Sequence, residues 1–365
     1  MIFAAVAGLG GSLPAMAQGV TQAMRPADPF SVRGIAVDAS AESAAAARPL
    51  ALAEGQRRAF AQLLRRLTLP EDYGRLPRPS EALLNDTVAG FGIDEERTSA
   101  TRYIGKITVQ FRADGIRRLL QEARIPYSET TSRPVLVVPV WQTAEGVRIW
   151  EAGNPWREAW QRRPEGDSLV PLSIAPATPD GGGPSLERLL GSPDELQGMM
   201  RKGGFDDALV LTATLQQADP GNMRIDLYVH HQGLAAGGGA AFLNGLETMT
   251  VTGGTQEETL LTAALELTRR IEARWKYATV IDLEKQGQIS AMAAFGSLAE
   301  WTKLRAALGA VPTLRKVEVL QLSHRNAQLL LDYYGEPGQL GTALAQRDIL
   351  LLQQDGYWTM RGRQP

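Results

Sequence analysis

The sequence predicts a multi-domain protein of the α+β and α/β classes. Helical and alternating hydrophobic patterns follow one another along most of the 365-residue chain. Hydrophobic residues make up 44% and charged residues 21%, which is ordinary for a globular protein. The length is sufficient for about two or three cores. We therefore expect a small α+β domain at residues 18–130, a middle mixed-sheet α/β domain at 131–278 and a C-terminal ferredoxin-like domain at 288–362.

The first 17 residues have the pattern of an export signal. An apolar stretch at residues 2–13 leads to Ala15-Met16-Ala17, a small-x-small pattern that signal peptidase cuts, here before Gln18. No Lys or Arg precedes this stretch, so either the true start lies further upstream or the signal is atypical. No segment approaches the roughly 20 apolar residues that a spanning helix needs. We expect residues 1–17 to be a cleaved signal peptide and the protein to be periplasmic, not integral to the membrane.

The N-terminal domain begins with a strand pattern at residues 32–37, followed by an alanine-rich helix that ends near Leu67. The apolar residues of this helix recur at helical spacing and form one stripe. Four arginines lie off that stripe: Arg57, Arg58, Arg65 and Arg66. Extended runs at 92–98 and 101–111 predict a hairpin, and a helix at 114–124 closes a small α+β domain.

The middle domain opens with an uninterrupted β-branched run at residues 135–140, which fits a strand buried on both faces. Asn154-Pro155 predicts a helix start, since Asn caps and Pro occupies the first turn. The Pro- and Gly-rich residues 164–184 are typical of a loop. We expect further helices at 193–202 and 256–276, and strands at 208–215, 223–230 and 241–251.

The third segment gives the clearest fold pattern. Strand, helix, two strands, helix and strand follow one another between residues 290 and 361, with a break in the last strand at Asp355-Gly356. The order β-α-β-β-α-β is the ferredoxin-like plan. This plan serves many functions, so it indicates none in particular.

Several phrases of the chain resemble landmarks of a known family. They are Ser99-Ala100-Thr101-Arg102-Tyr103, Pro134-Val135-Leu136-Val137-Val138-Pro139-Val140, Asn154-Pro155-Trp156 with Trp160, and Leu331-Asp332-Tyr333-Tyr334-Gly335 followed by Gln339-Leu340. Together they are similar to the proteobacterial exported family catalogued as domain of unknown function 2066 (DUF2066). The resemblance spans nearly the whole mature chain and implies an exported protein. The family has no assigned activity, so it implies no catalytic residues.

Composition and motifs argue against most chemistries. The chain has no cysteine, which excludes disulfides, thiolate nucleophiles, cysteine metal sites and a lipoprotein anchor. Its 38 Lys and Arg nearly balance its 40 Asp and Glu, which argues against a nucleic-acid binder. Neither a phosphate-binding loop nor a zinc-binding helix nor a nucleophile elbow occurs. We therefore predict a non-enzymatic protein without a cofactor, a metal site or catalytic residues.

Two groups of residues remain as candidate contacts with a partner or ligand. The first is a tryptophan cluster: Trp141, Trp150, Trp156 and Trp160. On one alternative these rings stack on sugar rings or anchor a partner protein. On the other, which we favour, they pack in the core beside a hydrophobic strand. The second is the arginine row, by which we mean Arg57, Arg58, Arg65 and Arg66. On one alternative these side chains face anionic lipid, phosphorylated glycan or an acidic partner. On the other, which we favour, they form a solvated helix face.

The leading functional hypothesis is an interaction or scaffold module that contacts an envelope protein during cell-envelope assembly or maintenance. The alternative is a periplasmic module that binds cell-wall glycan or anionic lipid through the tryptophans or the arginines. The identity of the partner, the oligomeric state and the free sheet edges do not follow from the sequence.

Overall fold

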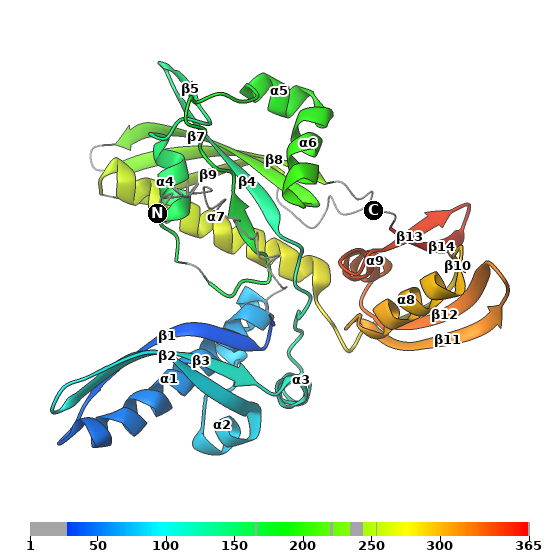
Figure 1. Cartoon of the computed structure of the whole chain (residues 1–365), viewed down its shortest axis with the longest axis horizontal. Helices are drawn as coiled ribbons and strands as arrows, with labels where there is room; N and C mark the ends of the chain where they lie inside the picture. The colour runs from blue at the N-terminus through cyan, green and yellow to red at the C-terminus, as the bar shows by residue number, and fades with distance from the viewer. Residues whose placement is uncertain (1–27, 165, 220–221, 234–243, 253, 364–365) are drawn as a thin grey trace, which may run out of the picture.

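The computed structural model describes residues 28–164, 166–219, 222–233, 244–252 and 254–363. It is a mixed α+β protein with three sheets and several helices, so the predicted class is confirmed at that level (Figure 1). The predicted signal peptide, residues 1–17, lies outside the described residues. In the part of the chain that is described, no helix is long and apolar enough to cross a membrane.

The first sheet is antiparallel, with the strand order β1-β3-β2. Its strands are β1 (Ser31–Ser40), β2 (Val88–Thr98) and β3 (Arg102–Phe111), and its helices are α1 (Ala44–Leu67), the 3₁₀ helix η1 (Pro70–Arg75), α2 (Glu81–Thr87) and α3 (Ala113–Glu122). Helix α1 packs closely against the sheet at Gly55. A Cβ atom added to this glycine would lie 2.5 Å from Val37 Cγ1 and 2.8 Å from Ile107 Cδ1. The absence of a side chain at Gly55 therefore permits this close packing.

The middle sheet is mixed and has the order β5-β4-β7-β8-β9, with β6 also beside β4. Strand β4 is parallel to β6 and β7, whereas the other pairs are antiparallel. Its strands are β4 (Val135–Thr143), β5 (Gly146–Arg148), β6 (Leu172–Ile174), β7 (Asp207–Asp219), β8 (Asn222–Gly233) and β9 (Gly245–Thr252). Its helices are α4 (Pro155–Gln161), α5 (Leu186–Gly191), α6 (Pro193–Gly203) and α7 (Gln256–Thr279).

Helices cover both faces of the middle sheet around β4. Val135 and Val137 belong to the core that contains α4 and α7, whereas the alternate residues Leu136 and Val138 pack with α5 and α6. Successive side chains of a strand point to opposite faces. The continuous apolar run at the start of β4 therefore corresponds to a strand buried on both sides, as predicted.

The C-terminal sheet departs from the predicted plan at its last strand. Its strands are β10 (Gln286–Ala294), β11 (Leu314–Leu322), β12 (Asn326–Tyr334), β13 (Ile349–Gln354) and β14 (Tyr357–Gly362), and its helices are α8 (Leu298–Gly309) and α9 (Pro337–Ala345). The order is β11-β12-β10-β14-β13, and β14 is parallel to β10. In a β-α-β-β-α-β sheet the strand after the second helix would run antiparallel to the first strand. Here the chain reverses at Asp355-Gly356, and the second arm of the resulting hairpin occupies that place. The prediction of a single, interrupted last strand is therefore wrong.

One apolar core joins the first two sheets. It extends from Phe30 and Leu63 near α1 to Trp156 and Trp275 near the middle sheet. The C-terminal sheet packs α8 and α9 in a separate core. Residue 130, the predicted end of the first domain, therefore lies in a region of shared packing.

Candidate functional site

The three sheets meet along the linker between α3 and β4. The indole Nε1 of Trp275 on α7 donates to the carbonyl of Thr130 at 2.7 Å. Three residues further on, the backbone N–H of Arg133 donates to Oε1 of Gln346, just after α9, at 2.8 Å. The linker is therefore hydrogen-bonded to the middle unit on one side and to the C-terminal unit on the other.

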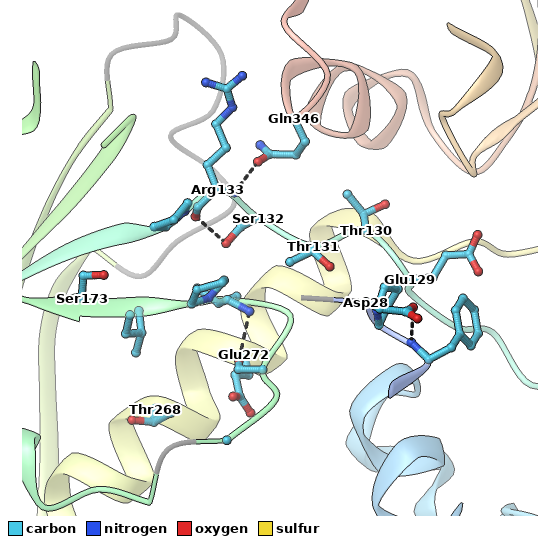
Figure 2. A pocket seen from close by; sticks show the side chains of 18 of the residues that line it. Asp28, Glu129, Thr130, Thr131, Ser132, Arg133, Ser173, Thr268, Glu272 and Gln346 are labelled. Atoms are coloured by element: carbon cyan, nitrogen blue, oxygen red, sulfur yellow. Dashed lines mark hydrogen bonds between the residues drawn. The ribbon is translucent and has the colours of Figure 1, made fainter. Parts of the chain in front are cut away.

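A cleft of about 1000 Å³ opens at this junction, and we call it the junction cleft. Its walls come from the start of β1, helix α3, the linker, the end of α4, β6 and the loop before it, one face of α7, and the ends of α8 and α9 with the turns that follow them. The wall residues labelled in Figure 2 include Thr130, Thr131, Ser132, Ser173, Thr268 and Glu272. Hydroxyl and carboxylate groups of this kind suit a ligand that forms hydrogen bonds.

Five arginines line the junction cleft: Arg33, Arg117, Arg133, Arg163 and Arg347. The first three are held by carboxylates: Arg33 by Asp167 at 2.5 Å, Arg117 by Glu129 at 2.8 Å and Arg133 by Asp206 at 2.8 Å. A further contact links Arg133 to Asp348 of the C-terminal unit at 2.5 Å. These pairs join segments that are distant in the sequence, so their main effect is to hold the walls of the cleft in place.

Arg163 differs from these three. Its guanidinium lies 4.5 Å from the centre of the Trp160 ring, and it donates to the Trp160 carbonyl at 3.2 Å and to Thr268 Oγ1 at 3.0 Å. Among the described residues, no carboxylate lies at ion-pair distance from Arg163 or from Arg347. Burial lowers the pKa of Arg163, and the nearby charge of Glu272 opposes that effect. Arg163 is thus a fixed, partly desolvated cation in the cleft wall.

Two buried polar atoms of cleft residues have no hydrogen-bond partner among the residues that the structure describes. They are Nε1 of Trp160, whose side chain is 1% exposed, and Oγ1 of Thr130, which is 6% exposed. By contrast, Nε1 of Trp156 donates to the Leu211 carbonyl at 3.0 Å. Buried polar groups without a partner are uncommon, because each costs about 1–3 kcal/mol. Both residues line the junction cleft, which makes them candidates for contact with a polar ligand.

The local sequence explains how α4 positions Arg163. Asn154 precedes the helix, and its Oδ1 accepts the backbone N–H groups of Trp156 and Arg157 at 3.0 and 3.1 Å. Trp156 and Trp160 lie one helical turn apart on the buried face, with their rings in an edge-to-face arrangement 5.6 Å apart. This packing fixes the end of α4, from which Arg163 returns over the Trp160 ring.

The four candidate tryptophans are interior residues. Trp141, Trp150, Trp156 and Trp160 are 5%, 6%, 0% and 1% exposed. Their alternative as a surface platform for sugars or a partner protein is therefore wrong, because the rings are covered by the sheet and its helices. Packing, the favoured alternative, accounts for them. Trp160 is also part of the cleft wall.

The candidate arginine row does not form one binding face. Arg57 pairs with Glu54 at 3.3 Å, and Arg58 donates to the Ala36 carbonyl. The guanidinium of Arg65 lies over the Tyr73 ring at 5.8 Å. Arg66 turns inward, where it donates to the carbonyls of Pro29 and Ser31 at 3.1 and 2.7 Å. Its side chain is 7% exposed, so the prediction that all four arginines share a solvent-facing row is wrong for Arg66.

The structure also shows which strands end the sheets. Strands β1, β2 and β11 are edges whose pairing is interrupted by register shifts, a feature that opposes the addition of another strand. Strands β9 and β13 also end sheets, and they pair with β8 and β14 without a register shift. Leu246 on β9 is 68% exposed, and Tyr228 opposite it is 44% exposed. The edge of β9 is thus a regular strand with apolar side chains on its surface.

Sequence reasoning did not identify Arg163, Thr130 or Glu272 as site residues. One weak signal was available: Thr268 and Glu272 are four residues apart and so share a face of the long α7 helix. The other cleft residues belong to separate loops that only the tertiary structure brings together. No group of three His, Asp or Glu residues with metal-binding geometry occurs in the ranges that the structure describes.

Comparisons with known proteins identify no family. No protein-family model matches the chain, and no curated protein matches it. Among solved structures, it is similar to a crystal structure of formyltetrahydrofolate deformylase from Pseudomonas putida KT2440, with 11% identity over 66% of this chain and 93% of that one. The TM-score of 0.18 is too low for this likeness to support a fold or an activity.

Proposed function

We propose that this protein is an exported, non-enzymatic binding module of the bacterial cell envelope that holds a small polar ligand in the junction cleft. One observation carries the proposal: Trp160 and Thr130 line a cleft of about 1000 Å³, and their buried Nε1 and Oγ1 atoms have no hydrogen-bond partner in the described part of the chain. A ligand with hydrogen-bonding groups would satisfy both atoms. This proposal keeps the ligand-binding hypothesis that the sequence offers as its alternative. It assigns the binding to residues of the junction cleft instead of the tryptophan cluster and the arginine row.

The proposed compartment depends on the sequence. The signal pattern of residues 1–17 and the resemblance to the DUF2066 family support export to the periplasm. Cell fractionation with a C-terminal tag would test this part separately. Recovery of a shortened chain in the periplasmic fraction is the expected result, and a full-length cytoplasmic chain would contradict it.

Native mass spectrometry of the protein purified from its own periplasm tests the cleft. The wild type is expected to carry a small molecule, and Thr131→Trp is expected to lose it because the larger side chain fills the cleft. Thr302→Trp, at an exposed position of α8 outside the cleft lining, is the matched control and should retain the molecule. Retention by Thr131→Trp, or a wild type without added mass, would contradict the proposed function.

A second candidate is the interaction module that the sequence favours. The regular edge of β9 supports it, because among the described residues this strand pairs only with β8, and a free strand edge can accept an extended segment of a partner. Photo-crosslinking in cells from Thr248, an exposed residue of β9, is expected to capture one specific envelope protein. Glu318 on β11, an edge with register shifts, is the control position. Equal capture from both positions, or none from Thr248, would count against strand addition at β9.

A further inference from the structure

We infer that the ligand of the junction cleft is a sugar-like molecule with an acidic group, carboxylate or phosphate, beside its hydroxyls, and that Arg163 binds the acid. This inference rests on the proposed function and specifies the class of its ligand. It follows from the unsatisfied donors and acceptors in the part of the cleft wall formed by α4, the linker and α7.

The donors in this part of the cleft require an acceptor. An indole N–H only donates, and the buried Nε1 of Trp160 finds no acceptor among the described residues, so an acceptor on the ligand would satisfy it. Arg163 uses one N–H for Thr268 and one for the Trp160 carbonyl, which leaves other guanidinium N–H groups available. These donors are near one another because Arg163 lies over the Trp160 ring. An anionic oxygen is the acceptor that a guanidinium binds most strongly.

The rest of the wall favours hydroxyl groups on the ligand. Glu272 follows Thr268 by one turn of α7, and its carboxylate can only accept hydrogen bonds. The Thr130 hydroxyl, which can donate or accept, has no hydrogen-bond partner in the ranges that the structure describes. A purely anionic ligand would be repelled by Glu272. A ligand whose hydroxyls donate to Glu272 while its acid binds Arg163 satisfies both groups.

The position of Arg163 makes it a specific anchor. Arg33, Arg117 and Arg133 are each neutralised by a carboxylate at 2.5–2.8 Å. Arg163 has no such partner in the described part of the chain, and its two hydrogen bonds and its contact with Trp160 hold it in one orientation. It therefore offers a charge that is already desolvated and oriented, which reduces the cost of binding an anion.

Isothermal titration with matched pairs of sugars tests the inference. N-Acetylmuramic acid is compared with N-acetylglucosamine, which lacks its carboxylate, and glucose 6-phosphate with glucose. At least one acidic member is expected to bind, and its neutral counterpart roughly 10- to 100-fold more weakly, because a charged hydrogen bond is lost. The pair that responds identifies the acid as carboxylate or phosphate. Equal binding of the acidic and neutral members would overturn the inference.

Variants locate the contact. Arg163→Gln is expected to weaken binding of the acidic sugar roughly 10- to 100-fold, whereas Arg162→Gln should not change it. Arg162 is the matched control because it is exposed, adjacent in sequence and paired with Glu257 instead. Unchanged affinity in Arg163→Gln would refute the role of this residue.

A spectroscopic signal keeps the test independent of how well the variants fold. In a ¹H–¹⁵N correlation spectrum of the wild type, the Trp160 indole N–H, assigned with Trp160→Phe, should shift when the acidic sugar binds. If none of the sugars shifts it but a low-molecular-weight periplasmic extract does, the acidic-sugar inference fails and the proposed function stands. If neither shifts it, both fail.

Discussion

Replacement of Asn154 by alanine is expected to cost far more stability than an ordinary N-cap substitution. This side chain is fully buried. Its Oδ1 accepts the backbone N–H groups of Trp156 and Arg157, and its Nδ2 donates to the carbonyls of Pro139 and Arg148 at 3.0 and 3.1 Å. Asn154 therefore both starts α4 and attaches it to β4 and β5.

The magnitude follows from these hydrogen bonds. Loss of the cap costs about 1 kcal/mol. Each of the two carbonyls left without its donor adds about 1–2 kcal/mol, because the site is buried. The free energy of unfolding should therefore fall by about 3–5 kcal/mol in Asn154→Ala. Ser185→Ala is the control in the same unit, because Ser185 is an exposed N-cap of α5 with one hydrogen bond, to the backbone of Arg188; it should cost about 0.5–1 kcal/mol.

Urea unfolding followed by tryptophan fluorescence measures this difference, since four tryptophans lie within or beside β4 and α4. Asn154→Ser, which retains a cap oxygen but lacks the amide donors, should fall between the control and Asn154→Ala. If Asn154→Ala lowers the free energy of unfolding no more than Ser185→Ala does, the hydrogen bonds to Pro139 and Arg148 do not add the expected stability.

Two further predictions concern α1 and its neighbours. Burial lowers the pKa of Lys276 from its ordinary 10.5 to about 8, so between pH 8 and 10.5 the unfolded chain binds more protons than the folded one and stability should rise with pH. At about 1.4 kcal/mol for each pH unit, this rise in stability amounts to roughly 3 kcal/mol. Denaturation of the wild type at several pH values should show the rise. If the rise persists in Lys276→Met, it does not come from Lys276. Gly55→Ala should lower the unfolding free energy by about 1–3 kcal/mol, because its Cβ would meet Val37 and Ile107. Gly74→Ala, where nothing lies within 4 Å of the added Cβ atom, is its control; similar losses in both would show that the contact at α1 is not the cause.

Local patterns predicted much of the fold because the relevant signals are short in range. The apolar run at 135–140 identified a strand buried on both faces, and Asn154-Pro155 identified the start of α4. The C-terminal unit shows the limit of such patterns. Asp355-Gly356 indicated a break, but whether β13 or β14 pairs with β10 depends on how the whole sheet assembles. Local sequence carries no information on that choice.

The candidate site was largely beyond prediction for the same reason. Trp160 was recognised as part of a helix that packs, but its partner Arg163 follows the helix in a loop. Thr130 and Glu272 are separated from it by many residues in the chain and reach the junction cleft only through the linker and α7. The arginine row illustrates the opposite error. Helical spacing places Arg66 on an exposed face, whereas in the structure it turns inward to the carbonyls of Pro29, just before β1, and Ser31, the first residue of β1.

The position of β14 has a consequence for assembly of the chain. This strand lies between β10 and β13, although it comes last of the five in the sequence. During synthesis, β10, β11 and β12 can pair as soon as they emerge, but the other side of β10 stays unpaired until residues 357–362 are available. In the described part of the chain, the only neighbour of β13 in the sheet is β14. Loss of β14 through a premature stop or a proteolytic cut before Tyr357 would thus leave β13 without a partner as well. It would also expose an edge of β10 that is prone to aggregation.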